Sequence, residues 1–304
     1  MANICQAGPV RIAHADPRAP LAIIAGPCVL ESLELGLTVG RRVADHCREL
    51  GLAYVFKASF DKANRTSIDS ARGPGLERGM EWFSRIREAL GPGVALTTDI
   101  HEPSQAEPAA RVVDLLQIPA FLARQTDLLV AAGEAAARHG RAVNVKKGQF
   151  MSPGEMSGPV YKLAQAGCTN TMVTERGTFF GYGRLVNDLL GVAEMRELRV
   201  AGPRGEAWGP VPVCFDCTHS TQRPGAGEGG KVTGGNARLA PLLARAAVAS
   251  GIDALFLETH PDPARAMSDA ATQIPLGEVG RVLREVGALR RTLAELAATG
   301  AARI

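Results

Sequence analysis

The chain has 304 residues, of which 46% are hydrophobic and 21% are charged, and its formal net charge is +3. This is an ordinary globular composition. The sequence has no Lys/Arg-dense run of the kind found in nucleic-acid binders, so nucleic acid is not an expected partner. No apolar stretch reaches the ~18 residues that a membrane-spanning helix needs, so no membrane association is expected.

The N-terminal segment and the cysteines indicate the compartment. The segment Met1–Ile12 has no charged region ahead of an apolar core and does not resemble a secretory signal. Six cysteines in a chain of this length are not a disulfide scaffold. A reducing, cytoplasmic location is therefore expected.

Short and nearly continuous apolar runs recur along the chain, as expected for parallel strands that are covered on both faces. The eight predicted strands are Leu21–Gly26, Ala53–Ala58, Val94–Asp99, Val113–Pro119, Ala142–Lys146, Asn170–Glu175, Val211–Asp216 and Asp253–Glu258. Helix-forming segments separate them. The predicted helices are Glu34–Leu50, Gly75–Leu90, Pro103–Arg111, Asp127–His139, Gly154–Ala166, Gly183–Leu190, Ala237–Ser250 and Leu276–Ala298.

This alternation predicts an α/β fold of the (β/α)8 type, a TIM barrel, formed by residues 1–304 as a single domain. Residues 1–20 are expected to form a short N-terminal cap or hairpin that closes the bottom of the barrel. The main structural alternative is a doubly wound open sheet. No GxGxxG motif follows the first predicted strand, which argues against a dinucleotide-binding fold.

Polar residues gather at one end of the predicted strands. Active sites of such barrels lie on the loops at the carboxyl ends of the strands. The residues found there are Cys28, Lys57–Ser67, Asp99–His101, Arg124, Lys146–Lys147, Glu175–Arg176, Asp216–His219 and Glu258–His260. This one-sided distribution predicts a single active site at that end.

Two groups of cations at this end suit anionic substrates. The loop Lys57–Ser67 combines Lys and Arg with Asn and hydroxyl side chains, which suits a phosphate group. Lys146 and Arg176 follow neighbouring strands and offer a second anion site. The sequence therefore predicts binding of two phosphates, or of a phosphate and a carboxylate. The alternatives are a solvated charged loop at Lys57–Ser67 and a surface ion pair between Arg176 and Glu175.

Four residues at the strand ends have side chains that can bind a divalent metal, namely Cys28, His219, Glu258 and Asp269. A mixed sulfur, nitrogen and oxygen set favours Zn²⁺, Fe²⁺ or Mn²⁺ over Mg²⁺. A lone cysteine after a strand is more often a small buried hydrophobic residue, so Cys28 is the weakest of the four on the residues alone. Cys214 and Cys217 lie three residues apart on one predicted strand and should pack on opposite faces.

In this order, these segments resemble one family, 3-deoxy-D-manno-octulosonate 8-phosphate synthase, also called 2-dehydro-3-deoxyphosphooctonate aldolase. The resemblance covers nearly the whole chain. The matching stretches are Ile24–Ser32, Lys57–Ser67, Thr98–Pro103, Gln117–Asp127, Asn144–Phe150, Thr174–Gly177, Asp216–Ser220, Leu257–Pro261 and Ala266–Ala270.

The resemblance implies an enzyme, a transferase that condenses phosphoenolpyruvate with D-arabinose 5-phosphate and water. The products would be 3-deoxy-D-manno-octulosonate 8-phosphate and inorganic phosphate, in the biosynthesis of the inner sugar of lipopolysaccharide. It also implies a (β/α)8 barrel that assembles as a homotetramer.

The resemblance further implies roles for particular residues. Lys146 and Arg176 would hold the phosphate of phosphoenolpyruvate, and Lys62 would lie near its carboxylate and act as a proton donor. The arabinose 5-phosphate end would be bound by Asn64, Arg65 and Thr66, and by Arg124 of a neighbouring subunit. Thr66 stands where family members often have Ser, and the hydroxyl is kept. Further candidates are Lys57 and Gln117 for binding substrate, and Asp99 and His219 for catalysis.

The family divides into metal-dependent and metal-independent enzymes, with Cys in the first-strand motif of the metal type and Asn in the other. Cys28 therefore implies the metal-dependent type, with Zn²⁺, Fe²⁺ or Mn²⁺ held by Cys28, His219, Glu258 and Asp269.

Two alternatives remain beside this interpretation. The first is 3-deoxy-arabino-heptulosonate 7-phosphate synthase, whose loop typically reads Lys-Pro-Arg-Thr-Ser, whereas this chain has Asn64 between Ala63 and Arg65. The second is a non-catalytic barrel that binds sugar phosphates. The Gly-rich stretch Pro224–Gly235 is expected to act as a mobile lid over the site.

Overall fold

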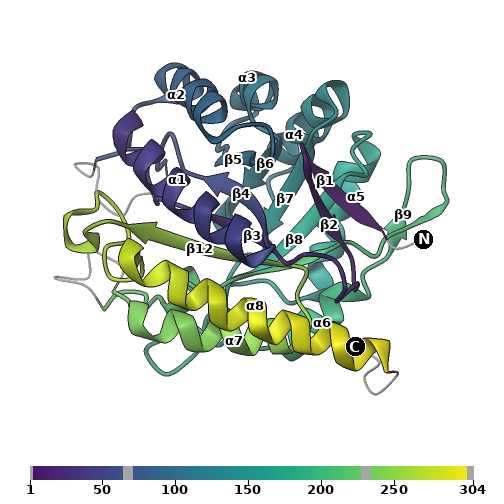
Figure 1. Ribbon diagram of the computed structural model, residues 1–304. Coiled ribbons are helices and arrows are strands. Elements are labelled where there is room, and N and C mark those ends of the chain that lie inside the picture. Colours follow the sequence, from purple (N-terminus) through teal and green to yellow (C-terminus); the bar gives the residue numbers. More distant parts are fainter. Residues whose placement is uncertain (1–2, 64–70, 227–233, 300–304) are drawn as a thin grey trace.

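The structure is a computed structural model that describes residues 3–63, 71–226 and 234–299. Eight parallel strands form its centre, with helices around them (Figure 1). In chain order they are β3 (Ala22–Gly26), β4 (Ala53–Lys57), β5 (Ala95–Asp99), β6 (Leu115–Ile118), β7 (Ala142–Lys146), β8 (Thr171–Glu175), β11 (Val213–Asp216) and β12 (Ala254–His260). Because β11 pairs with both β8 and β12, the sheet closes into a barrel. The predicted TIM barrel is confirmed, and the open sheet is excluded.

The helices follow the strands as a (β/α)8 fold requires. They are α1 (Leu33–Leu50), α2 (Leu76–Leu90), α3 (Ala106–Val112), α4 (Thr126–His139), α5 (Ser157–Gln165), α6 (Leu190–Arg196), α7 (Ala240–Ala249) and α8 (Leu276–Ala298). Short 3-10 turns occupy Pro103–Gln105, Ala120–Leu122, Gly154–Met156, His219–Thr221, Ala237–Leu239 and Pro263–Arg265. None of the described helices is long and apolar enough to cross a membrane.

One predicted helix, Gly183–Leu190, is wrong. Gly183 has a φ of +66°, which a helix does not allow, and Thr178 and Val186 pair across the loop. The helix begins only at Leu190, whose backbone N–H donates to the Asp188 side chain over 3.0 Å. The loop after β8 is therefore longer than the sequence pattern indicated.

The strands are buried on both faces, which explains their continuous apolar runs. In β3, the side chains of Ile23 and Ala25 pack outward in the cluster shared with the helices, while Ala22 and Ile24 pack inside the barrel. Cys214 lies in the inner cluster and Cys217 in the outer one, as predicted from their spacing. Both thiols are free.

An antiparallel hairpin of β1 (Ile4–Ala7) and β2 (Val10–Ala13) closes the end of the barrel opposite the site. Its buried side chains join residues from the starts of the barrel strands in the inner cluster, among them Ala22, Ala95 and Leu115. The predicted N-terminal cap is confirmed. A second hairpin, β9 (Val200–Ala201) with β10 (Ala207–Trp208), was not predicted, because strands of two residues leave no apolar pattern. The two-residue strand β13 (Ile274–Pro275) extends the sheet beside β12.

Candidate active site at the carboxyl end of the barrel

Besides β8, which ends on Glu175, four barrel strands end on a charged residue that is buried. The residues are Lys57 on β4, Asp99 on β5, Lys146 on β7 and Asp216 on β11. The carboxyl ends of the strands of a closed barrel lie together, so side chains that are far apart in the sequence meet in one concave site, the cup. Charged groups buried this deeply must be paired with one another or with a ligand.

Asp99 is the centre of a cluster of hydrogen bonds. Ser59 donates a short hydrogen bond to one carboxylate oxygen of Asp99, and Gln117 donates one to the other. The ammonium groups of Lys57 and Lys62 lie 4.0 and 3.9 Å from Asp99 Oδ2. Burial alone would raise the pKa of Asp99, but the nearby lysines outweigh it and hold the pKa well below its ordinary value. Asp99 is therefore a fixed anion that anchors both cations.

A chain of amide and hydroxyl groups extends this cluster across the barrel floor. Asn144 Nδ2 donates to Gln117 Oε1 over 3.0 Å, and Thr174 Oγ1 donates to Asn144 Oδ1 over 2.7 Å. The sequence analysis assigned no role to Ser59, Asn144 or Thr174 individually. Their signal in the sequence is a polar side chain at or near the end of an apolar run.

Lys146 and His219 share one carboxylate. Lys146 Nζ donates to Asp216 Oδ2 over 2.7 Å and lies 3.6 Å from the centre of the Phe256 ring. His219 Nδ1 lies 2.6 Å from the same oxygen, and the backbone N–H of His219 donates to Asp216 Oδ1. Burial would raise the pKa of Asp216, but His219 and Lys146 hold it well below its ordinary range. Asp216 thus orients a cation and an imidazole together, a role that the sequence analysis did not assign.

Three of the four predicted metal ligands come together. Cys28, Glu258 and Asp269 each place one ligand atom within 4.8 Å of the others. Cys28 Sγ lies 3.3 Å from Asp269 Oδ2. The fourth, His219, adjoins this group through Glu258, with 3.5 Å between His219 Nε2 and Glu258 Oε2. Three of the predicted ligands, from two loops and a strand, are therefore grouped together, and His219 lies beside one of them.

The chemistry of these donors fits a divalent transition metal. Glu258 Oε2 is buried and accepts no hydrogen bond from any residue that the structure describes, so it has a free lone pair for a cation. Burial raises the pKa of the Cys28 thiol, and a bound cation is what would ionise it. One sulfur, one imidazole and two carboxylates match the predicted Zn²⁺, Fe²⁺ or Mn²⁺ set.

Lys57 lies against this group of ligands. Its ammonium donates to Glu258 Oε1 over 2.6 Å and to the backbone oxygen of Cys28 over 3.2 Å. The side chain is almost fully buried. Lys57 thereby joins the Asp99 cluster to the metal-ligand group, and its assignment to substrate binding stays a prediction.

Arg176 offers an unpaired cation to the cup. Its Nη2 donates to Gln222 Oε1 over 2.7 Å, while its Nη1 is buried without a hydrogen-bond partner among the described residues. Gln222 in turn donates to Asp269 Oδ1 over 2.9 Å, a link that sequence reasoning missed. The surface ion pair with Glu175 is not what the structure shows, because Arg176 is buried and Glu175 Oε2 lies 3.5 Å from Lys147 Nζ.

The remaining predicted residues lie at the edge of the cup or outside the described chain. The ammonium of Lys62 is held among acidic groups that raise its pKa above the ordinary value against the effect of burial, so it stays charged. Arg124 is exposed on the loop after β6, 3.9 Å from Glu155. Asn64, Arg65 and Thr66 fall outside the described residues, as do residues 227–233 of the predicted lid.

Comparison with known proteins identifies the family. A model of the DAHP synthetase I family matches residues 12–295. The chain belongs to the DAHP synthetase I family. Within it, the chain is 51% identical over 276 residues to the 2-dehydro-3-deoxyphosphooctonate aldolase of Nitratidesulfovibrio vulgaris strain DP4, covering 91% of this chain and 94% of that protein.

Two further relatives carry the same name. The 2-dehydro-3-deoxyphosphooctonate aldolase of Syntrophotalea carbinolica is 48% identical over 270 residues, 89% of this chain and 91% of that protein. That of Cyanothece sp. is 48% identical over 275 residues, 90% of this chain and 94% of that protein. The family resemblance found in the sequence is therefore confirmed.

Proposed function

We propose that the protein is a 2-dehydro-3-deoxyphosphooctonate aldolase that condenses phosphoenolpyruvate with D-arabinose 5-phosphate and water. The products are 3-deoxy-D-manno-octulosonate 8-phosphate and inorganic phosphate. The relatives of that name, up to 51% identical along almost the whole chain, support this assignment. The step leads toward the inner sugar of lipopolysaccharide.

One observation of the site carries the proposal. Among the described residues, two oppositely charged groups of the cup have a buried atom without a hydrogen-bond partner: Arg176 at Nη1 and Glu258 at Oε2. An unpaired guanidinium N–H needs an anion, and an unpaired carboxylate oxygen needs a cation. A site that binds a phosphate beside a divalent metal satisfies both.

The residues of the cup suit the steps of the condensation. Lys146 and Arg176 bind the phosphate of phosphoenolpyruvate, and Asp216 orients Lys146 through their 2.7 Å contact. Lys62, held charged near Asp99, donates a hydrogen bond to the aldehyde oxygen and stabilises the charge that develops on it. C3 of phosphoenolpyruvate bonds to the aldehyde carbon, and water adds at C2. The bond between C2 and the phosphate oxygen then breaks, and phosphate leaves.

Cys28, His219, Glu258 and Asp269 would hold the divalent metal. When bound, the metal supplies a Lewis acid that polarises a carbonyl or lowers the pKa of water. Removing it with a strong chelator should abolish activity, and a divalent transition metal should restore it. Full turnover in protein shown by elemental analysis to be metal-free would refute the metal-dependent assignment.

The choice of sugar substrate is tested by measuring the rate of phosphate release from phosphoenolpyruvate in the presence of each of two sugar phosphates. Release should be fast with arabinose 5-phosphate and slow with erythrose 4-phosphate. Equal or faster release with erythrose 4-phosphate would support 3-deoxy-arabino-heptulosonate 7-phosphate synthase instead. Binding of both substrates with no phosphate release would support a non-catalytic barrel.

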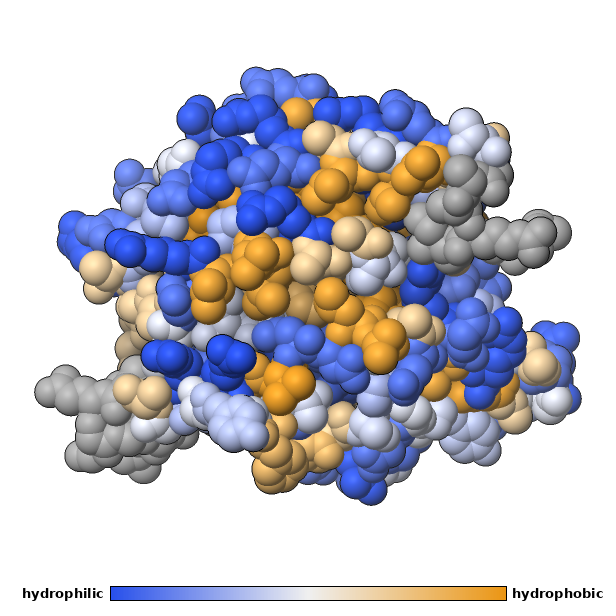
Figure 2. All heavy atoms as spheres, turned by 90° about the horizontal axis from the view of Figure 1, so that it is seen from below, coloured by the Kyte–Doolittle hydropathy of each residue, from blue (hydrophilic) through white to orange (hydrophobic). Residues whose placement is uncertain are grey.

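We also propose a homotetramer in which Arg124 reaches the sugar phosphate of a neighbouring subunit. Large apolar side chains are exposed on the loops after β6, β7 and β8, at Phe121, Phe150 and Phe180. Figure 2, which faces α7 and α8, shows further apolar side chains bordered by polar ones. Exposed apolar areas of this kind support an association surface. Sedimentation of the wild type and of Phe180→Asp tests it, with a smaller species expected for the variant.

A cytoplasmic location is part of the proposal. All six cysteines are free and buried, which suits a reducing compartment.

A further inference from the structure

One amide side chain, Gln222, connects the predicted anion site to the predicted metal ligands. Its Oε1 accepts a 2.7 Å hydrogen bond from Arg176 Nη2, and its Nε2 donates a 2.9 Å hydrogen bond to Asp269 Oδ1. Gln222 therefore contacts a residue expected to bind phosphate and a residue expected to bind a metal. The guanidinium and the carboxylate are joined through this amide.

The orientation of the amide is fixed by its two partners. A guanidinium has only hydrogen-bond donors, and an ionised carboxylate has only acceptors. The oxygen of Gln222 must therefore face Arg176, and its nitrogen must face Asp269. A charged side chain at this position would repel one of the two, because a carboxylate would oppose Asp269 and an ammonium would oppose Arg176. A neutral amide suits both.

The backbone of Gln222 is fixed by the same turn that carries His219. Gln222 directly follows the 3-10 turn His219–Thr221, and its N–H donates to the backbone oxygen of His219 over 3.0 Å. Its own backbone oxygen accepts from the N–H of Leu185, in the loop after β8, over 3.4 Å. The side chain thus starts from a point tied to a predicted metal ligand and to the loop that follows Arg176.

Each partner of Gln222 has a second atom that faces the site. The backbone N–H of Arg176 is anchored by Glu175 Oε1 over 3.0 Å, and its Nη1 is buried without a hydrogen-bond partner among the described residues. The other oxygen of Asp269, Oδ2, lies 3.3 Å from Cys28 Sγ, on the side of the predicted metal ligands. Gln222 therefore holds one atom of each group and leaves another directed at a ligand.

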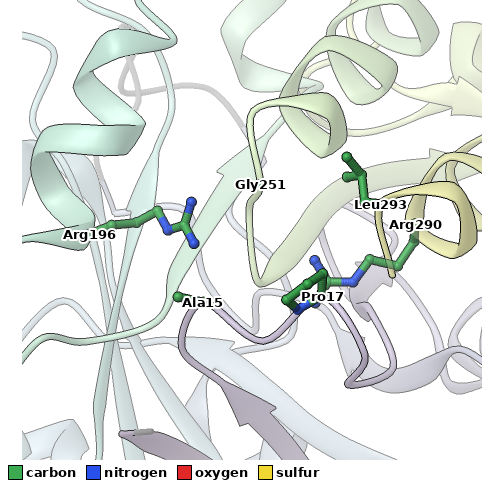
Figure 3. Close-up of a pocket in the computed structure, with 6 residues that line it drawn as sticks. All are labelled: Ala15, Pro17, Arg196, Gly251, Arg290 and Leu293. Carbon is green, nitrogen blue, oxygen red and sulfur yellow. The ribbon is translucent and has the colours of Figure 1, made fainter. Parts of the chain in front are cut away.

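Arg290 shows how a buried arginine is held when its surroundings satisfy it fully. It lies in a pocket at the amino end of the barrel (Figure 3), and its three side-chain nitrogens donate to the backbone oxygens of Ala19, Ile252 and Asp16. Arg176 differs, because a side-chain amide holds its Nη2 and no described residue accepts from its Nη1. The direction of the Arg176 guanidinium therefore depends on Gln222.

We propose that Gln222 is a positioning residue that couples Arg176 to Asp269, so that a divalent metal and phosphoenolpyruvate strengthen each other's binding. When a metal holds Asp269 in place, the carboxylate fixes the amide, and the amide directs Arg176 at the anion. Linkage makes the effect reciprocal, so a bound anion tightens the metal by the same factor. The inference rests on the proposed function, which supplies both ligands.

Binding of Mn²⁺ to the full chain tests the coupling without a sugar phosphate, and hence without turnover. The protein is first stripped of metal with a chelator. Electron paramagnetic resonance of free Mn²⁺ then gives the metal Kd with and without saturating phosphoenolpyruvate, and a titration without protein corrects for Mn²⁺ bound by phosphoenolpyruvate itself. The ratio of the two Kd values is the coupling factor, which should be at least about fivefold in the wild type.

Gln222→Leu removes both hydrogen bonds of the amide at similar side-chain volume. The coupling factor should be at least about threefold smaller than in the wild type, because the hydrogen-bonded link is lost. The metal Kd without phosphoenolpyruvate should rise ~10- to 100-fold, as expected for loss of an outer-shell partner. Gln222→Asn is the second variant if Gln222→Leu does not fold. It keeps the amide but is one methylene too short to reach both partners, so it should lower the factor in the same way.

Gln273→Leu is the matched control. Gln273 is a buried amide on the metal-ligand side, where its Oε1 accepts from the backbone N–H of Cys28 over 3.4 Å and its Nε2 donates to the backbone oxygen of Ser268 over 2.8 Å. Neither of these contacts involves Arg176. The variant should therefore keep the wild-type coupling factor, whatever its metal Kd.

Three results would overturn the inference: a coupling factor of about one in the wild type, an unchanged factor in the folded Gln222 variants, or an equal fall in Gln273→Leu. Failure of the proposed function is distinguished by a separate assay. Wild-type protein that couples Mn²⁺ to phosphoenolpyruvate but releases no phosphate with arabinose 5-phosphate would refute the proposed function and leave the coupling in place. Wild-type protein that binds no phosphoenolpyruvate would refute both.

Discussion

Cys28 is the residue on which the metal proposal depends most closely. Its thiol is one of three donors within 4.8 Å of each other, and it lies 3.3 Å from Asp269. Cys28→Ser should lower metal affinity by at least the ~10- to 100-fold that follows loss of an outer-shell partner. Elemental analysis after dialysis measures this, and activity should fall in parallel. Cys217→Ser, another buried free thiol, is the control and should keep its metal.

Asp99 is expected to make the free energy of unfolding depend on pH in a defined direction. Its folded pKa lies well below the ordinary value, because the lysines around it outweigh burial. Its contribution to stability is therefore complete above about pH 4 and is lost as the pH falls toward the folded pKa. Below about pH 4, the free energy of unfolding of the wild type should drop faster than that of Asp99→Asn, by about 1 kcal/mol per pH unit. Urea unfolding across pH 5 to 3 measures this, and parallel slopes would show that Asp99 is not a fixed anion.

Residue types at the strand ends predicted where the candidate site lies, but the pairings between its side chains were not predictable. A lysine such as Lys57 at a strand end is visible in the sequence, whereas its 2.6 Å contact with Glu258 depends on how two strands curve toward each other. Gln222 and Asp216 were missed as organising residues for the same reason. Their importance lies in the contacts with Arg176, Asp269 and Lys146, which no local pattern encodes.

At the end of β3, Gly26 lies directly against the backbone of β4. A Cβ on Gly26 would lie 1.9 Å from the backbone oxygen of Lys57, and backbone cannot move aside as a side chain can. Gly26→Ala should cost at least about 3 kcal/mol of unfolding free energy and should displace Lys57, so activity falls as well. Urea unfolding and turnover together test this prediction.

The control for Gly26 is Gly158, in α5. A Cβ there meets nothing within 4 Å, and its backbone is helical. Gly158→Ala should raise stability by about 0.5–1 kcal/mol, since it removes flexibility from a helix. If both substitutions had the same effect, close backbone contact would not be the reason for glycine at position 26.

Elements in which apolar residues repeat regularly were predictable from the sequence. Segments whose backbone is fixed by a glycine or by a single pair of residues across a loop were not. The helix α8 was predicted with the bounds that it has, because its apolar face repeats over 23 residues. The segment Gly183–Leu190 has a helical composition but lies in a loop, where Gly183 and the pairing of Thr178 with Val186 override it. In such places, tertiary contacts determine the backbone conformation, and the helix propensity of the residues does not.

For the whole molecule, the barrel separates its two ends by function. Charged and polar side chains fill the carboxyl end, and the amino end is closed by the β1–β2 hairpin around an apolar inner cluster. This division lets the hairpin contribute stability without contacting the candidate active site. We therefore expect that the two ends can be perturbed independently.

Ile12 tests that separation. It is fully buried, and its side chain packs from β2 into the inner cluster of the barrel. Ile12→Ala should cost about 2–5 kcal/mol of unfolding free energy, because it leaves a cavity under the strands. Ile4, on the same hairpin, is 39% exposed, and Ile4→Ala should cost less than about 1 kcal/mol. Below the unfolding temperature, turnover at saturating substrate should be the same in both variants. A fall in turnover for Ile12→Ala while the protein remains folded would show that the hairpin is coupled to the active site.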